Sequence, residues 1–153
     1  MTMLETFRPL IDAARGLDLS QPDIARDVLA DRFHPAGNEA RALNSKLIEL
    51  LEQGRIAERG AMPVKFGRVT KAVPESDDFS IDVVHMDGPG PHHAHPGGEV
   101  NYCIALEGEP RFDGAAPGWV VMPPGSAHVP TVTGGRMLIV YLLPGGRIEF
   151  TKT

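Results

Sequence analysis

The chain has 153 residues, which fits one domain, and its 42% hydrophobic and 23% charged content argues against a disordered or fibrous protein. A formal net charge of −5 without a basic run is poorly suited to phosphate backbones or anionic membranes, so we expect no nucleic-acid or membrane partner. The N-terminus lacks a signal-peptide pattern, no stretch has the roughly 18 apolar residues of a transmembrane helix, and the single cysteine permits no intrachain disulfide, so we expect a cytoplasmic protein.

The first 60 residues predict a helical segment. Apolar residues recur at helical spacing in residues 4–14, 24–33 and 38–53. Ser20 can accept a hydrogen bond from the exposed amides at the start of the second helix. Three short helices bury little surface alone, so we expect their apolar stripes to pack on the second half of the chain or on a partner subunit.

The remainder, from residue 61 to 153, predicts strands, because short apolar runs alternate with glycine and proline turns. The expected strands are residues 64–70, 79–86, 100–106, 119–122, 128–132 and 137–142, with 147–151 as a last edge strand. This pattern is typical of an antiparallel sandwich or barrel. We therefore divide the chain into an N-terminal helical segment, residues 1–60, and a β-barrel domain, residues 61–153.

Four of the six histidines lie between residues 92 and 128. His93, His95 and Glu99 share the same parity, so in an extended chain their side chains can point to one face, while His92 points to the other. His128 follows the turn Pro123-Pro-Gly125, which can return the chain so that this histidine faces the barrel interior from the opposite side.

Three histidines and one glutamate form a nitrogen and oxygen donor set. Such a set suits divalent first-row metals, namely Fe, Mn, Zn, Ni or Co, and the residue types do not choose among them. By the same parity, Asn101 and Cys103 face the same cavity. Tyr141, in the apolar run 137–142, belongs to the core or reaches the pocket with its hydroxyl.

The spacing His93-x-His95-x₃-Glu99 followed by Pro123-x-Gly125-x₂-His128 resembles the two motifs of the cupin superfamily. The resemblance implies a mainly β protein, a single antiparallel cupin barrel (jelly roll) preceded by the helical segment, with the metal held by those three histidines and the glutamate. Two departures are visible: Gly108 stands later than the glycine that closes the first motif, and Val132 stands where many cupins carry Asn.

A narrower resemblance covers most of the chain. Residues 118–150, the run Gly108-Glu-Pro-Arg-Phe-Asp113 and above all Pro130-Thr-Val-Thr-Gly-Gly-Arg136 are similar to the 4-hydroxylaminobenzoate lyase family of nitroaromatic catabolism. The resemblance implies conversion of 4-hydroxylaminobenzoate to 3,4-dihydroxybenzoate (protocatechuate) with release of ammonia. The catalytic candidates are Asn101 and Tyr141, with Arg136 or Arg111 as partner of the substrate carboxylate.

Other functions stay open at the level of sequence. The same metal set can serve an iron-dependent cupin dioxygenase acting on an aromatic or thiol substrate, a sugar or keto-acid isomerase, or a non-catalytic ligand-sensing cupin. Cupins commonly pair through their sheets, so a homodimer is expected, and the helices can form either a lid over the barrel or part of that interface.

Overall fold

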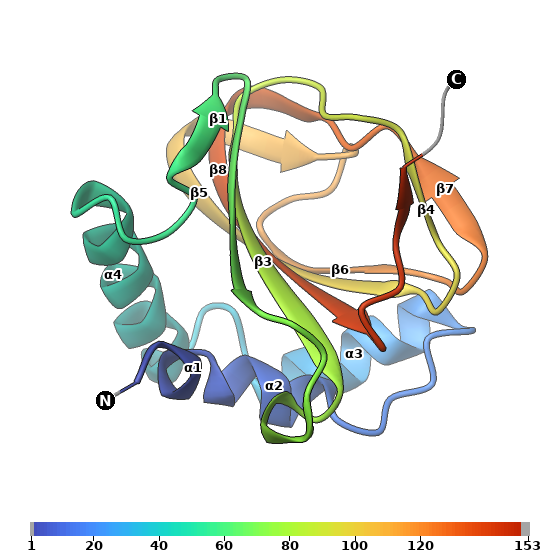
Figure 1. Ribbon diagram of the computed structural model, residues 1–153. Coiled ribbons are helices and arrows are strands. Elements are labelled where there is room, and N and C mark those ends of the chain that lie inside the picture. The colour runs from blue at the N-terminus through green and yellow to red at the C-terminus, as the bar shows by residue number, and fades with distance from the viewer. Residues whose placement is uncertain (1, 151–153) are drawn as a thin grey trace.

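The computed structural model describes residues 2–150 and consists of two antiparallel sheets with a layer of helices below them (Figure 1). The helices are α1 Met3–Thr6, α2 Arg8–Ala14, α3 Pro22–Arg32 and α4 Asn38–Glu52, with a short 3₁₀ helix at Pro74–Ser76. None of the helices in the described range is long and apolar enough to cross a membrane. The expected class, mainly β in a cupin-like barrel with N-terminal helices, is confirmed.

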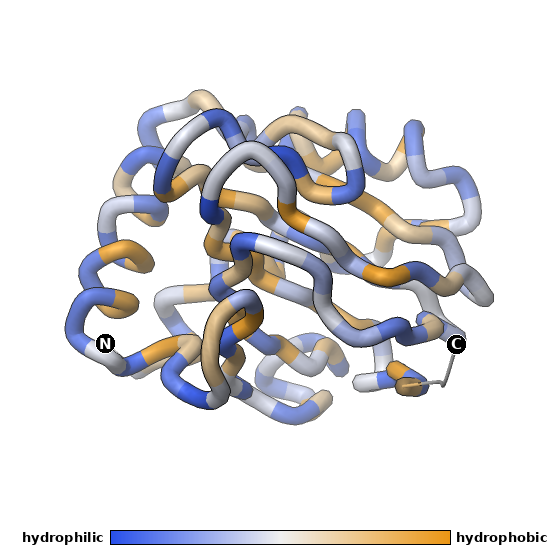
Figure 2. Tube along the Cα trace, turned by 90° about the horizontal axis from the view of Figure 1, so that it is seen from above, coloured by the Kyte–Doolittle hydropathy of each residue, from blue (hydrophilic) through white to orange (hydrophobic). Residues whose placement is uncertain are grey.

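The larger sheet has six strands and the smaller has three. In spatial order the larger contains β1 Arg59–Ala61, β2 Val64–Thr70, β3 Phe79–Met86, β8 Val132–Pro144, β5 Glu99–Phe112 and β6 Gly118–Met122. The smaller contains β7 Ser126–His128, β4 His93–His95 and β9 Glu149–Phe150. Figure 2 shows hydrophobic positions along the strands and hydrophilic positions at many of the turns. The long strands form the wall of the barrel, and the short ones close it.

The expected first helix, residues 4–14, is two helices that meet at Phe7. Pro9 lies in the first turn of α2, where its missing N–H costs nothing. One continuous helix would instead press the proline ring against the carbonyl of Glu5, four residues earlier. The prediction of an uninterrupted helix is therefore wrong, because the proline starts a new one.

β5 and β8 are longer than the strands expected at residues 100–106 and 137–142, and two other expected strands differ further. The prediction of a strand at residues 128–132 is wrong, because β7 ends at His128 and β8 begins at Val132. Pro130 lies between them and has no N–H to give to a ladder. The expected edge strand at residues 147–151 is shortened to β9, and its last residue lies outside the described range.

The six-stranded sheet is covered on both faces. Along β5 and β8 one set of alternate residues, including Tyr102, Val140 and Leu142, packs with the apolar stripes of the helices in one core cluster. The other set, including Cys103 and Tyr141, faces the barrel interior. The helices thus lie on the second half of the chain, as expected, and cover the outer face of the sheet rather than the face that points into the barrel.

Polar contacts fix the helices to the sheet. The Trp119 indole N–H donates to the Phe33 carbonyl at 2.9 Å, and the Tyr102 hydroxyl donates to the Asn44 side chain at 2.8 Å. The Phe33 ring packs edge-on against both aromatic residues, with centroids 5.6 and 6.2 Å away. Because each buried polar group has a partner, the aromatic cluster can join helix and sheet without a desolvation penalty.

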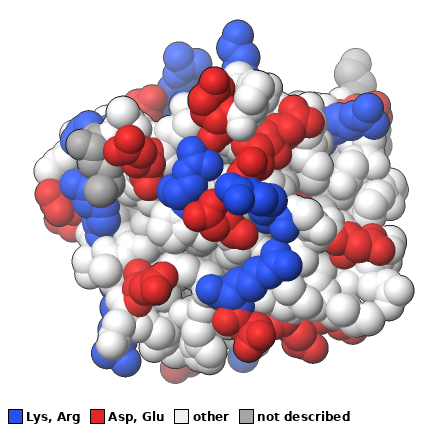
Figure 3. All heavy atoms as spheres, turned by 90° about the horizontal axis from the view of Figure 1, so that it is seen from below, with Lys and Arg blue, Asp and Glu red and all other residues white. Residues whose placement is uncertain are grey.

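The outer surface of the helical side carries both signs of charge. Figure 3 shows Lys and Arg side chains among Asp and Glu side chains on this side. Arg15, for example, lies 2.9 Å from Asp12 and 2.7 Å from Asp77. Exposed pairs of this kind add little stability individually, and we read this face as a solvated surface.

The distinctive glycine pair of residues 134–135 lies at an irregular part of the β5–β8 ladder. Gly108 and Gly135 are directly paired, and the register shifts just beyond Gly108. All three glycines have positive φ, and a Cβ on Gly108 would lie 2.5 Å from the Gly134 carbonyl oxygen. The late position of Gly108 in the cupin motif therefore serves a bulge at the end of the barrel, and leaves the metal ligands untouched.

Candidate metal centre

The structure brings His93, His95, Glu99 and His128 together. One donor atom from each lies within 4.8 Å of the donors of the other three. His93 and His95 come from β4, Glu99 begins β5, and His128 ends β7, where it is the direct cross-strand partner of His93. The predicted alternation along β4 is confirmed, but His128 comes from the neighbouring strand rather than from the opposite side of the barrel.

The cluster is removed from water. Glu99 and His95 have no exposed surface and His93 is 2% exposed, while the side chain of His128 is 14% exposed. The buried residues that face the barrel interior, among them Cys103 and Tyr141, lie beneath these side chains. The Phe112 ring belongs to the same group, and its centroid is 6.0 Å from that of His128. A buried carboxylate beside three imidazoles is costly unless the charge is balanced by a cation.

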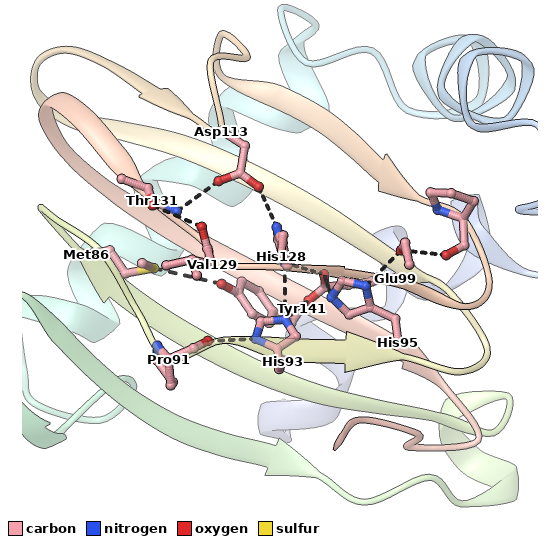
Figure 4. A network of polar contacts seen from close by, with 12 residues as sticks. Met86, Pro91, His93, His95, Glu99, Asp113, His128, Val129, Thr131 and Tyr141 are labelled. Carbon is pink, nitrogen blue, oxygen red and sulfur yellow. Dashed lines mark hydrogen bonds and ion pairs between the residues drawn. The ribbon is translucent and has the colours of Figure 1, made fainter. Parts of the chain in front are cut away.

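Each histidine uses its outer ring nitrogen, Nδ1, in a second contact (Figure 4). Nδ1 of His93 lies 3.2 Å from the Pro91 carbonyl oxygen, and Nδ1 of His128 lies on the Asp113 carboxylate. A carbonyl and a carboxylate only accept hydrogen bonds, so both Nδ1 atoms carry the proton. In the neutral ring, Nε2 is then left with a lone pair.

The Nδ1 atom of His95 also carries the proton, which it donates to a hydroxyl. This Nδ1 lies 3.0 Å from the Ser126 hydroxyl oxygen, which itself donates to the Pro123 carbonyl at 2.6 Å. Because the hydroxyl proton is already used, Ser126 accepts from His95. In their neutral forms, all three imidazoles therefore direct an unprotonated Nε2 to the centre of the cluster, which is the form that binds a metal.

The inner contacts place acceptors against acceptors. Nε2 of His95 lies 2.7 Å from a Glu99 oxygen, and Nε2 of His128 lies 3.2 Å from Nε2 of His93. His95 Nε2 and both Glu99 oxygens are buried without a hydrogen-bond partner. Facing lone pairs at these distances repel unless a cation or a shared proton lies among them. The donor set therefore fits a divalent first-row metal, and its ligand types do not single out one ion.

The charges around the site act on its titrating groups. Burial opposes ionisation of Glu99, but contacts with His128, His93 and His95 outweigh it and hold the pKa of the carboxyl well below its usual value. Burial likewise opposes the cationic form of His128, but Asp113 and Glu99 raise its pKa to about 9. A metal at the centre would take the place of that proton, so binding should release it at neutral pH.

The residues behind the four candidate ligands were not predicted from the sequence. Asp113 holds His128 with one oxygen and accepts from the Thr131 amide at 2.9 Å with the other. It sits in a turn with φ 49°, and its own amide donates to the Thr131 carbonyl. The signal available was Asp113-Gly114, a turn sequence after a strand, but nothing in the sequence pairs that turn with His128. Ser126 lies inside the second cupin motif, so the sequence placed it beside His128 but did not indicate its contact with His95.

A cavity of about 570 Å³ opens beside the cluster and reaches His93 and Tyr141. Most of its lining is apolar. It comes from one face of β1, β2 and β3 and from Ile148 and Phe150 near the C-terminal end of the described chain. The lining residues are Arg59, Val64, Phe66, Arg68, Asp82, Val84, Met86, Gly90, Pro91, His93, Pro130, Tyr141, Ile148 and Phe150. Its volume and apolar walls suit a small aromatic molecule.

Two predicted catalytic residues lie near the cluster. Tyr141 is 6% exposed, lines the cavity, and has its ring centroid 6.4 Å from that of His93. Asn101 is its direct partner on β5, fully buried, and both polar atoms of its amide lack a hydrogen bond. Cys103 is buried on the same face, and burial raises the pKa of its thiol above the usual range, which leaves it an inert thiol.

The arginines expected to bind a carboxylate lie elsewhere. Arg136 donates to Nε2 of His85 at 2.8 Å and lies 3.4 Å from Glu107, and Arg111 donates to the Gly114 carbonyl at 3.3 Å. Neither is among the described residues that line the cavity. Arg136 therefore stays a prediction without support from its position. Two other arginines, Arg59 and Arg68, do line the cavity.

The chain is similar to known proteins over most of its length. The 4-hydroxylaminobenzoate lyase (PnbB) family model matches residues 12–150. A 4-hydroxylaminobenzoate lyase from Pseudomonas putida is 28% identical over 142 residues, 80% of each chain. One from Nocardioides sp. (strain LMS-CY) is 34% identical over 94 residues, so the match spans 56% of that relative and 56% of this chain.

Solved structures resemble the fold distantly. A cupin-like protein from Thermotoga maritima has a TM-score of 0.42 at 16% identity, covering 62% of this chain and 84% of the other. A putative acetylacetone dioxygenase from Methylibium petroleiphilum has the same score and identity, covering 58% and 66%. On the strength of the match over residues 12–150, the chain belongs to the 4-hydroxylaminobenzoate lyase family.

Proposed function

We propose that this protein is a metal-dependent lyase that converts 4-hydroxylaminobenzoate to 3,4-dihydroxybenzoate and ammonia. The hydroxylamino oxygen leaves as water when the N–O bond breaks, one water adds to the ring carbon beside the nitrogen, and a second hydrolyses the resulting imine and releases ammonia, so the net reaction consumes one water. The N–O bond is the internal oxidant, so the balance needs neither dioxygen nor a nicotinamide or flavin. Membership of the lyase family supports the reaction, and the buried donor cluster supports its dependence on a metal.

The observation that carries the proposal is the position of the cluster in the wall of an apolar cavity. His93 belongs to both, with its ring among the ligands and against the cavity. When bound by His93, His95, Glu99 and His128, a divalent metal supplies Lewis acidity toward a hydroxylamino group and lowers the pKa of a bound water. The apolar walls exclude bulk water from the ring of a bound substrate.

Asn101 and Tyr141 are the polar groups that we assign to the reacting atoms, because Tyr141 lines the cavity and Asn101 is its cross-strand partner on β5. Burial, with the nearby carboxylates, raises the pKa of Tyr141 well above its usual value, so its phenol stays protonated and can donate. Its present contact, 3.8 Å to the Met86 sulfur, is a weak one that a substrate oxygen can replace. Asn101 offers both a donor and an acceptor without a partner, which suits orientation of the attacking water.

The test is turnover in the absence of oxygen. Protein loaded separately with Fe, Mn, Zn, Ni or Co is incubated with 4-hydroxylaminobenzoate, and ammonium and 3,4-dihydroxybenzoate are measured. We expect equal amounts of the two products with at least one metal and none after chelation. Ammonium absent with every metal contradicts the lyase, and oxygen consumption with catechols or thiols in its place indicates the dioxygenase.

A matched pair of variants separates the site from the fold. Glu99→Gln removes the ligand charge and should abolish metal binding and turnover. Glu107→Gln changes the same residue type on the same strand, where the side chain is 69% exposed, and should leave both unchanged. Equal activity of the two variants would contradict the assignment of the metal site. The homodimer also stays a proposal, which light scattering of the purified protein tests.

A further inference from the structure

The outer end of the cavity holds two arginines and one aspartate. Arg68 and Asp82 are direct cross-strand partners on β2 and β3, and Arg59 of β1 is the direct partner of Phe66. Cross-strand partners point to the same face of a sheet, as do residues two apart on one strand. All four side chains therefore lie on the cavity face, and all four line it.

The charges at this end do not cancel. The Arg68 guanidinium donates to both oxygens of Asp82, at 3.1 and 3.4 Å, and the pair is electrically neutral. Within residues 2–150 the structure shows no ion pair or hydrogen bond to the Arg59 side chain, which is exposed. One positive charge thus stays uncompensated at the mouth, beside a hydrogen-bonded guanidinium that retains further N–H groups.

Arg59 and Tyr141 lie on strands three spacings apart, which leaves room for an arginine side chain and one aromatic ring. Arg59 pairs with Phe66, Phe66 with Val84 and Val84 with Ile139, so three strand spacings of roughly 4.8 Å separate the backbone of Arg59 from β8, where Tyr141 lies two residues from Ile139. Val84, Met86 and the exposed rings of Phe66 and Phe150 line the cavity with them. A flat ring fits this apolar surface with its two substituents directed to opposite ends.

We propose that Arg59, supported by the Arg68–Asp82 pair, forms a carboxylate subsite that selects aromatic acids whose metal-binding substituent lies opposite the carboxylate. The carboxylate accepts from the Arg59 guanidinium, and the ring lies against Phe66 and Phe150. This subsite rests on the proposed function for the identity of the reacting group, but its own chemistry is anion recognition. It assigns to Arg59 the role that the sequence suggested for Arg136 or Arg111.

The test measures binding without turnover. The Kd values of metal-loaded protein for the unreactive 4-aminobenzoate and for aniline, which lacks the carboxylate, are determined by calorimetry. In the wild type we expect tighter binding of 4-aminobenzoate. Arg59→Gln should weaken that binding about tenfold and leave aniline unchanged, because one partly exposed charge-assisted pair is lost. Arg59→Lys should weaken binding less than Arg59→Gln, since it keeps the charge but not the planar fork.

Two further variants sharpen the result. Asp82→Asn removes a negative charge from the subsite and should tighten 4-aminobenzoate binding, while Arg26→Gln, at an exposed arginine of α3, should change nothing. Unaltered affinity of Arg59→Gln, or no preference for the acid in the wild type, would overturn the subsite. Loss of the lyase reaction with the binding preference intact would count against the proposed function alone.

Discussion

The Asp113 carboxylate should control metal binding although it is not a ligand. In the structure one of its oxygens accepts from Nδ1 of His128 and the other accepts from the Thr131 amide. Asn at this position has one acceptor and one donor, so it can satisfy only one of those two donors. If its amide nitrogen faces His128, the imidazole must move its proton to Nε2, which then cannot bind the metal.

The magnitude follows from that geometry. Loss of a hydrogen bond behind a metal ligand lowers metal affinity about 10- to 100-fold, which corresponds to roughly 1.4 to 2.7 kcal/mol. We expect Asp113→Asn to lose metal affinity near the 100-fold end of this range. It should bind metal no better than Asp113→Ala, because only Asn stabilises the wrong tautomer of His128. Asp87→Asn, at an exposed aspartate after β3, is the matched control and should bind as the wild type does.

The assay is competition for metal against a chromophoric chelator at pH 7, with circular dichroism to confirm that each variant is folded. An Asp113→Asn protein that binds metal as tightly as the wild type would refute the tautomer argument. A loss in Asp113→Ala that is clearly larger than in Asp113→Asn would show that the carboxylate acts by filling space or through Thr131, and not by fixing the proton of His128.

Three other predictions follow from the structure. The pKa of His128 is about 9 instead of the ordinary 6.5, so its protonated form stabilises the folded metal-free protein. This stabilisation is fully present below pH 6.5 and is lost as the pH rises through 9. Denaturant unfolding of the metal-free protein should therefore give a falling free energy over this interval, whereas metal affinity should rise. Gly135→Ala should destabilise the fold by more than about 3 kcal/mol in denaturant unfolding, because its Cβ would overlap the Glu107 carbonyl oxygen. Trp119→Phe should cost about 1–3 kcal/mol in the same experiment, because the buried Phe33 carbonyl loses its donor.

Two of the four candidate ligands could be predicted from alternation alone, because His93 and His95 lie two residues apart on one strand. Glu99 lies beyond the turn at residues 96–98 and begins another strand, so its place, like that of His128, was given by the resemblance to the cupin motifs. The helices could also be placed on the sheet in outline, since an apolar stripe must be buried somewhere. Both inferences depend on local periodicity, which a single sequence displays directly.

The rest of the site depends on which strands lie side by side. Asp113 reaches His128 from a turn fifteen residues earlier in the chain, and Arg59 lies beside Phe66 because of the β1–β2 register. These pairings produce no periodic pattern in the sequence from which they could be predicted. The choice of Arg136 for the carboxylate shows the same limit, because this residue preceded the expected strand 137–142 but lies within β8, and its guanidinium points to His85 and Glu107.

A metal bound at the cluster would also have a structural consequence for the barrel. The sheet that closes it is small, since β4 and β7 have three residues each and β9 has two, so few backbone hydrogen bonds hold it. Two of its strands carry the three histidines, whereas Glu99 begins a strand of the six-stranded sheet. A metal bound by all four residues therefore joins the small sheet to the large one, and its binding energy becomes part of the folding energy of this edge. Without metal the buried carboxylate and imidazoles repel or take up protons, and the strands that carry them lose their main tether. The four residues proposed to hold the metal would thus also hold together the edge of the barrel beside the proposed substrate cavity.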